Sequence, residues 1–400
     1  MKASKILYST AIIFFISFTA YSQKTIRGKV TDSNQSVKFC SIYYSDHPSI
    51  GTSSNEDGEF ILFYADSLLY DSITFSAIGY IKKNIPVKKL LDNSIIELKP
   101  NTIVLNEVEV ISFKDSIGAI MINVFNKFKD NMPSKRHQLH GYYQEHTYKR
   151  KDSTFLWLWE ADIIVEDYAY KNNNERIRIK INQLRKSEDN RSRGLIYNLK
   201  KVFSHHDKTN NLFRTYETQI RKYNNPYLRF NNNFTDDHDF TLVSYFTNSS
   251  DSLIRVKYEH NGNFKYRFSY GYLTISLNDL SIKQVEDYIY DGFLNYTLIK
   301  FQKINNRYYP SFIKVIAPSA INPTKETTVS SIVFYKVNNN RNFEKIRNKH
   351  LLNREEYLHT LKFEEDMDFW GTYPYSKLNP VDPKIILSII QNKPYSEINE

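Results

Sequence analysis

The sequence has few of the residues that brace or interrupt a protein chain: one cysteine, 11 glycines and 12 prolines among 400 residues. A single cysteine, Cys40, cannot form an internal disulfide, so stability has to come from hydrophobic cores. Beyond the N-terminal region, no segment is apolar over the roughly 20 residues that a transmembrane helix requires. These absences exclude a disulfide-stapled miniprotein and a protein with several membrane-spanning helices.

The motifs that identify common enzyme classes are missing as well. The sequence contains no G-x-S-x-G elbow, no H-E-x-x-H, no C-x-x-C and no glycine-rich phosphate loop. Cys40 lies in the alternating run V-K-F-C-S-I-Y-Y, where a thiol behaves as a small buried hydrophobe. We therefore predict no catalytic residues, no metal ion and no cofactor.

Histidines and acids nevertheless gather at three places. The three groups are His137 with His140, His205-His206-Asp207, and Asp236-Asp237-His238-Asp239. None has the ligand spacing of a known zinc site. We interpret all three as polar surface clusters, with residues 236–239 as the first candidate if any of them binds a metal.

The first 22 residues have the features of an export signal. Two lysines precede an apolar run from Ile6 through Ala20, and A-Y-S at 20–22 places small residues where a signal peptidase cleaves. We predict cleavage between Ser22 and Gln23, and hence an exported protein that is periplasmic or associated with the outer membrane. An uncleaved membrane anchor is the alternative.

The formal charge of +10 is a mild basic excess. Because the protein is predicted to be exported, this charge does not indicate a nucleic acid partner. The densest basic cluster consists of Lys82, Lys83, Lys88 and Lys89. We interpret it as a strand edge protected by lysines, with contact to anionic lipid as the alternative.

Aromatic residues are abundant, with 31 tyrosines and 26 phenylalanines. Such side chains pack well on pleated surfaces, so a mainly β protein is expected. Residues 23–111 contain six short strand-like runs at a spacing typical of a small β-sandwich. These runs are Thr25–Asp32, Val37–Tyr44, Glu59–Tyr64, Ser72–Ala77, Tyr80–Val87 and Ser94–Leu98.

The stretch N-E-D-G-E-F at 55–60 combines three acidic residues with a glycine. Asn55, Asp57 and Glu59 alternate as in a calcium loop, but no acidic residue follows at a suitable position. We therefore predict a structural turn formed by Asn55, Asp57 and Gly58, in which Gly58 adopts a positive φ.

Residues 112–400 are predicted to form a larger α+β domain. Between Asp115 and Asp130 the apolar residues recur with a helical period and form one stripe. Afterwards the β-type alternation returns, for example at Ile254–Tyr258, with a hairpin turning at 278–279. We expect an antiparallel sheet covered by the helix, interrupted by an irregular insertion near 186–237.

Two aromatic groups are candidates for packing or binding. Phe155, Trp157 and Trp159 alternate with leucines, which would place three rings on one face of a strand. We interpret them as core, with ligand binding as the alternative. A second group near the C-terminus is interpreted as a packing plug: Phe369, Trp370, Tyr373 and Tyr375.

Four segments carry a resemblance to a known family. They are G-K-V-T-D at 28–32, G-T-S-S-N-E-D-G-E-F-I-L at 51–62, F-S-A-I-G-Y at 75–80 and L-N-E-V-E-V at 105–110. In order and spacing they resemble the carboxypeptidase regulatory-like domain, although Q-S-V-K at 35–38 replaces the usual proline and glycine. The resemblance implies a prealbumin-like β-sandwich without catalytic residues, of a kind found in envelope proteins of Gram-negative bacteria.

The leading hypothesis for function is a non-catalytic envelope protein that binds a hydrophobic molecule, a glycan or another envelope protein, and that is at most peripheral to a membrane. One alternative is a hydrolase without a recognised motif, which would require Asp236, His238 and one histidine of the 205–206 pair to converge. The other is a small outer-membrane β-barrel within residues 139–340, which the charged alternate positions disfavour. The sequence identifies no ligand-binding residues.

Overall fold

A computed structural model describes the chain between Lys24 and Glu397 with several gaps. The described residues are 24–33, 35–64, 66–90, 94–101, 107–167, 178–187, 238–247, 251–261, 267–291, 294–319, 322–340, 342–347, 365–373, 388 and 395–397. The predicted cleavage site at Ser22 and Gln23 lies outside these ranges, as does nearly all of the insertion predicted near 186–237. Within the ranges, no helix combines the length and hydropathy that crossing a bilayer requires.

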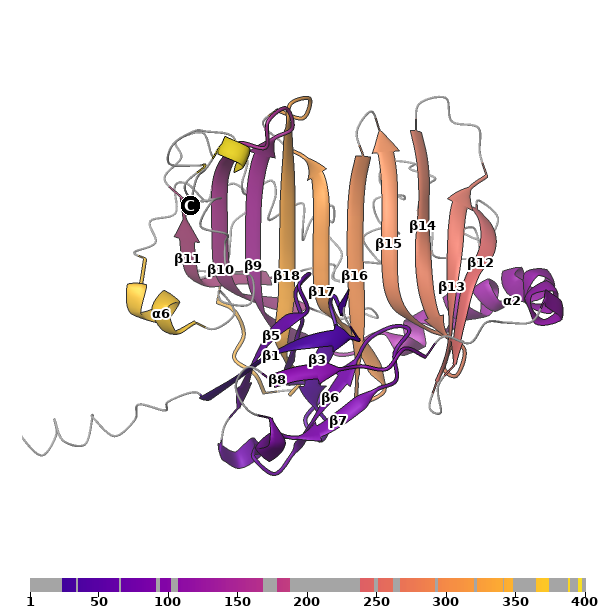
Figure 1. Ribbon diagram of the computed structural model, residues 1–400, viewed down its shortest axis with the longest axis horizontal. Helices are drawn as coiled ribbons and strands as arrows, with labels where there is room; N and C mark the ends of the chain where they lie inside the picture. The colour runs from indigo at the N-terminus through magenta and orange to yellow at the C-terminus, as the bar shows by residue number, and fades with distance from the viewer. Residues whose placement is uncertain are drawn as a thin grey trace, which may run out of the picture.

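The N-terminal domain is a sandwich of two four-stranded sheets (Figure 1). The first sheet has the order β2 (Gln35–Ser36), β1 (Lys24–Asp32) and β5 (Glu59–Tyr64), with β8 (Ser94–Glu97) parallel to β1. The second has the order β4 (Gly51–Ser53), β3 (Ser41–Tyr44), β6 (Ser72–Ser76) and β7 (Lys83–Pro86). Apolar side chains from both sheets, among them Val30, Ile42 and Phe75, are buried between them. The predicted small sandwich is confirmed, and Cys40 is buried in its core.

The N-E-D-G-E-F stretch forms the turn that leads into β5. The side-chain oxygen of Asn55 accepts hydrogen bonds from the backbone N–H groups of Asp57 (2.9 Å) and Glu59 (2.8 Å). Gly58 has a φ of +77°, and a Cβ there would lie 2.4 Å from the carbonyl oxygen of Val30. Both the backbone conformation and the close approach to β1 require glycine at this position.

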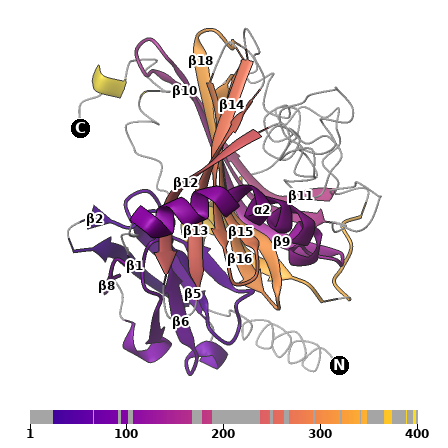
Figure 2. The ribbon, with the colours of Figure 1, turned by 90° about the vertical axis from the view of Figure 1, so that its right-hand side faces the viewer.

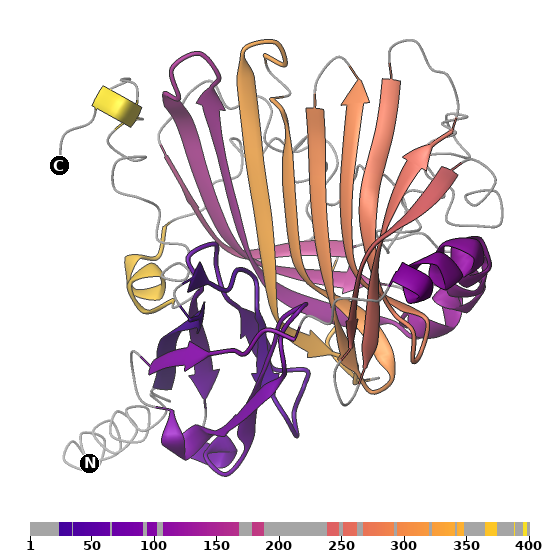
Figure 3. The same ribbon diagram turned by 45° about the vertical axis from the view of Figure 1, so that its right-hand side comes forward.

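The second domain is built on a ten-stranded antiparallel sheet, which fans out in Figure 3. Its order is β11 (Arg178–Lys186), β10 (Phe155–Asp167), β9 (His137–Lys149), β18 (Glu326–Asn338), β17 (Arg307–Pro318), β16 (Leu294–Ile304), β15 (Ser281–Asp291), β14 (Arg267–Ser276), β13 (Ser252–His260) and β12 (His238–Thr247). Neighbouring strands follow the chain except at one place, where β18 returns to pair with β9. The sheet is therefore two meanders joined along that pair.

Helix α2 (Glu107–Asn131) packs on one face of this sheet, as predicted. Its buried residues, including Met121, Val124 and Phe128, form one core with Val256 and Ile299 of the sheet. We call this side of the sheet the helix face. The helix begins eight residues earlier than the predicted start at Asp115, because the β-type alternation at 107–110 spans only four positions and is too short to oppose the helix.

The sandwich packs on the opposite side, which we call the sandwich face, over the lower part of the strands in Figure 1. Phe39 of the sandwich stacks on Phe312 of β17 with ring centroids 4.6 Å apart. The backbone N–H of Val337 donates to the carbonyl of Ser49 at 2.9 Å. In Figure 2 the sandwich lies at the lower left and α2 crosses the middle of the view. The two domains are thus in direct contact through side chains and backbone.

The aromatic run of β10 differs from its prediction. A register shift between Phe155 and Trp157 leaves Leu156 without a partner on β9. As a result Trp157 and Trp159 are buried in the core of the helix face, whereas the Phe155 ring lies against Tyr148. The three rings do not share one face, because a β-bulge inserts an extra residue and reverses the alternation.

Candidate ligand cavity between the two domains

A cavity of about 120 Å³ lies where the sandwich meets the ten-stranded sheet. The sandwich lines it with the β3 residues Ser41 and Tyr43, with Phe39 just before β3, and with residues 76–80. The sheet domain contributes side chains from β12, β13, β15, β16 and β17, together with Asp251 just before β13. Neither domain alone encloses this space, so the site exists only in the assembled protein.

Basic residues dominate the charged part of the lining. Four lysines and a single carboxylate residue, Asp251, line the cavity. The lysines are Lys82, Lys283, Lys300 and Lys303. Clefts lined by one sign of charge concentrate ions of the opposite sign. The cavity is therefore suited to an anionic group.

Lys300 on β16 points from the sheet toward the sandwich. Its Nζ donates a hydrogen bond of 2.7 Å to the backbone carbonyl of Phe39, 261 positions away in the chain, and lies 5.2 Å from the centroid of the Phe39 ring. Burial lowers the pKa of Lys300 from 10.5 to about 8, although Cys40 and Glu286 oppose the shift. Around neutral pH the ammonium form still predominates.

Lys283 reaches the cavity because of a β-bulge. Thr274 pairs with Gln284 and the next residue pairs with Ile282, so Lys283 has no partner on β14. Its Nζ donates to the hydroxyl of Tyr308 at 2.5 Å and lies 3.6 Å from a carboxylate oxygen of Asp251. Bulges re-aim side chains in this way near functional sites.

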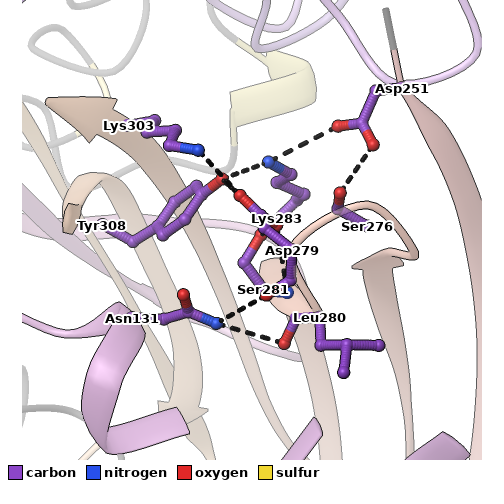
Figure 4. Close-up of polar contacts among 9 residues, drawn as sticks. All are labelled: Asn131, Asp251, Ser276, Asp279, Leu280, Ser281, Lys283, Lys303 and Tyr308. Atoms are coloured by element: carbon purple, nitrogen blue, oxygen red, sulfur yellow. Dashed lines mark hydrogen bonds and ion pairs between the residues drawn. The ribbon is translucent and has the colours of Figure 1, made fainter. Parts of the chain in front are cut away.

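Asp279, in the β14–β15 turn, holds Lys303 and Tyr308, two residues that line the cavity (Figure 4). It accepts hydrogen bonds from the Tyr308 hydroxyl (2.6 Å), the Lys303 ammonium (2.8 Å) and the Ser281 hydroxyl (2.5 Å). Asn131 at the end of α2 donates to the carbonyl of Asp279 at 3.2 Å. Burial raises the pKa of Asp279, but the hydrogen bonds outweigh it and hold this pKa well below the usual range.

Apolar side chains complete the lining. They include Phe246 from β12, Leu253 from β13 and Phe301 from β16, together with the ring of Phe39. Phe301 belongs to the core beneath α2, so this part of the wall is supported by the helix. The cavity thus places lysine ammonium groups beside aromatic rings.

A second polar group on the sandwich face is fully engaged in holding the structure together. The carboxylate of Asp162 accepts hydrogen bonds from Tyr335 (2.7 Å), Asn182 (2.9 Å) and Tyr373 (2.9 Å). Tyr373 follows helix α6 (Met367–Thr372), whose Trp370 is buried against the core of the sandwich. Phe369, Trp370 and Tyr373 pack as the predicted plug, whereas Tyr375 lies outside the described residues.

The histidine clusters of the sequence do not assemble into a site in the described ranges. His205, His206, Asp207, Asp236 and Asp237 fall outside those ranges, so the convergence required for the hydrolase alternative lies outside them too. His238 is described and stacks edge-on against His260 with centroids 5.2 Å apart. In the described part of the chain, no three histidine, cysteine or acidic residues are placed to hold a metal ion.

In the other histidine pair, His137 is buried in the sheet and His140 is partly buried. His137 is 1% exposed and its Nε2 lies 3.9 Å from Asp167. Burial lowers the pKa of His140 to about 4, with Lys336 and Lys180 adding to the shift. The interpretation of these two residues as a surface cluster was wrong for His137, because both histidines lie in β9, an inner strand that pairs with β10 on one side and β18 on the other.

The predicted turn and one lysine of the predicted basic cluster, Lys82, lie at the domain junction. Glu56, next to Asn55, forms an ion pair with Lys314 of β17. Lys82 lines the cavity, whereas Lys83 donates to the backbone carbonyl of Glu97 at 3.0 Å. Sequence reasoning missed Lys283, Lys300 and Lys303, because lysines in alternating strands ordinarily indicate a solvated face.

Comparison with known proteins adds one family assignment. Residues 26–110 match the CarboxypepD_reg-like domain family, in agreement with the resemblance and with the sandwich described above. No curated protein matches the chain.

Solved structures with some likeness include a LolA superfamily protein from Nitrosomonas europaea, with 12% identity, a TM-score of 0.23, and coverage of 57% of this chain and 94% of the other. A DUF1329 family protein from Desulfovibrio piger has 9% identity, a TM-score of 0.24, and coverage of 59% and 95%. An outer membrane lipoprotein-sorting protein domain from Vibrio parahaemolyticus has 6% identity, a TM-score of 0.27, and coverage of 57% and 95%. At these TM-scores the likeness carries no conclusion about function.

Proposed function

We propose that this protein is an exported, non-catalytic binding protein of the cell envelope, and that its ligand occupies the cavity between the sandwich and the ten-stranded sheet. The observation that carries the proposal is the composition of this cavity. Lysine ammonium groups and aromatic rings meet in a partly open cavity that both domains build. Ligand sites commonly lie at domain interfaces and combine apolar walls with a few placed polar groups.

The groups near the cavity favour binding over chemistry. No histidine, cysteine or glutamate is among the residues that line it. Burial raises the pKa of the nearby Cys40 thiol to about 12, so this thiol stays protonated and weakly nucleophilic. The carboxylate of Asp279 already accepts three side-chain hydrogen bonds. These groups hold the cavity in shape and are not poised as an acid and a base.

Export and envelope location are part of the same proposal. Their support is the signal-like segment at residues 1–22 and the CarboxypepD_reg-like domain at 26–110. A binding role fits a chain whose two domains contact each other directly, since a ligand at their junction touches both.

Analysis of what co-purifies with the protein tests the proposal. The mature protein isolated from its native envelope should carry a small molecule, detectable by native mass spectrometry and identified after extraction. Ala77→Phe, which adds a ring to the lining, should remove it. The control Ile95→Phe alters a side chain that is 73% exposed on the same sandwich and should retain the ligand. An empty wild-type protein, or equal occupancy in both variants, would contradict the proposal.

A further inference from the structure

We infer that the cavity binds the phosphate group of a small amphipathic phosphate ester, with Lys300 as the central contact and the ester's apolar part against the aromatic wall. This inference rests on the proposed binding function and specifies the chemistry of its ligand. It follows from three features of the cavity: an incompletely paired lysine, the absence of arginine in the lining, and the position of the apolar side chains.

The first feature is the pairing of Lys300. An ammonium group has three N–H donors. Within the described residues, the Lys300 ammonium group donates a hydrogen bond to the Phe39 carbonyl. No carboxylate of the described ranges forms an ion pair with it; Glu286, the acid that acts on it from a distance, is bound to Arg255 at 3.0 Å. Buried charges in proteins are normally paired. A lysine that reaches into a cavity without a counter-ion therefore indicates that an anion supplies the pair.

The neighbouring lysines add to the same charge. Lys283 and Lys303 have partial counter-ions in Asp251 and Asp279. Burial is the main cause that lowers the pKa of Lys283, and the nearby Lys303 and Lys82 lower it further. Asp279 and Asp251 offset this repulsion at Lys283. The lining still holds more lysines than carboxylates, and a bound anion would neutralise that excess.

The second feature favours phosphate over carboxylate. Among the described residues that line the cavity there are four lysines and no arginine. Arginine is the residue that recognises planar carboxylates in a bidentate manner, whereas lysine acts as a point charge and is a common phosphate ligand. Several point charges around one space suit a tetrahedral group that carries more than one negative charge.

The third feature concerns the rest of the ligand. A cavity of about 120 Å³ is smaller than the roughly 300–1,000 Å³ of sites that enclose a whole drug-sized molecule. It admits a headgroup, while Phe246 and Leu253 from the strands at the end of the sheet provide an apolar wall beside it. Inorganic phosphate would leave this wall unused, so an ester with an apolar substituent is the better match.

Isothermal titration of the mature full-length protein distinguishes the possible sources of the phosphate. Three probes are compared: inorganic phosphate, dihexanoyl phosphatidic acid and the uncharged dihexanoylglycerol. The phosphatidic acid should bind about 10-fold or more tightly than either other probe, since it alone engages both the lysines and the aromatic wall. Equal affinity for inorganic phosphate would show a site for free phosphate and overturn the amphipathic part of the inference.

Variants then locate the site. Lys300→Met should weaken binding of the phosphatidic acid about 10-fold or more, the loss expected for a charge-assisted hydrogen bond. Lys257→Met makes the same change on β13, outside the cavity lining, where the lysine is paired with Glu259, and should alter affinity less than about 2-fold. Lys303→Gln provides a second test, because it removes one positive charge at a side chain that is 45% exposed and places no second carboxylate beside Asp279. It should also weaken binding.

The outcome also separates this inference from the proposed function. If a co-purifying ligand is lost in Ala77→Phe but no phosphate probe binds, or Lys300→Met binds as well as the wild type, the cavity is a binding site of different chemistry and the inference is wrong. If neither a ligand nor a probe is found, the proposed function fails together with the inference.

Discussion

Lys300→Met should make the empty protein more stable at neutral pH. Methionine keeps an unbranched side chain of similar length but removes the charge. The pKa of Lys300 falls from 10.5 to about 8 on folding. A difference of about 2.5 units corresponds to roughly 3 kcal/mol against the folded state, and the lost hydrogen bond to the Phe39 carbonyl offsets about 1 kcal/mol of that. We expect a net gain of about 2 kcal/mol at pH 7.

The pH dependence identifies the cause of this gain. Between pH 8 and 10.5 the unfolded chain holds a proton on Lys300 that the folded protein has released, so this group makes the wild type more stable as pH rises. The cost of the charge is complete below pH 8 and vanishes above 10.5. At pH 9.5 it should have fallen from about 3 to about 1 kcal/mol, and the advantage of the variant should be close to zero.

Urea unfolding of the wild type and of Lys300→Met at pH 7 and 9.5, followed by tryptophan fluorescence, measures both quantities. A variant that is less stable at pH 7, or whose advantage is the same at both pH values, would refute the reasoning. In that case Lys300 would be a structural residue that stabilises the domain junction, and its charge would not serve to bind a ligand.

The remaining predictions concern the fold and the site. Gly58→Ala should destabilise the protein by at least about 2 kcal/mol, because of the positive φ and the 2.4 Å approach to the Val30 carbonyl. Gly118→Ala in α2, where a Cβ has open space, should instead stabilise the protein by up to about 1 kcal/mol. Thermal melts check both variants, and a neutral Gly58→Ala would contradict the turn geometry. Val124→Asp places a carboxylate in the core beneath α2 and should lower the free energy of unfolding by more than about 3 kcal/mol. Ile122→Asp, at a position 44% exposed, should lower it by less than about 1 kcal/mol. Similar losses of stability in urea unfolding would mean that the helix is not packed as described. Binding of the phosphatidic acid at pH 8.5 should be accompanied by uptake of a proton, since a bound anion raises the pKa of Lys300, which is about 8 in the empty protein. Calorimetric titration in two buffers of different ionisation enthalpy measures this uptake. If no proton is taken up, the ligand does not contact the Lys300 ammonium group.

Features that depend on interactions between neighbouring residues could be predicted from the sequence. The strands of the sandwich and the turn at Asn55 and Gly58 follow from alternation and from turn chemistry, both of which act over a few positions. The apolar stripe of α2 is equally local, and it identified both the helix and the face that packs on the sheet. The same patterns could not place the start of α2, because four alternating residues fit a helix as well as a strand.

The position of the candidate site, by contrast, depends on contacts between residues far apart in the chain. Lys300 meets the Phe39 carbonyl across 261 positions of sequence, and a strand lysine opposite a docked domain has the same local pattern as one that faces water. Lys283 enters the cavity, and Phe155 leaves the face of Trp157, because register shifts at β-bulges reverse the alternation. Such shifts are set by the pairing of whole strands and by the docking of the sandwich, so their free energy comes from contacts between residues far apart in the chain.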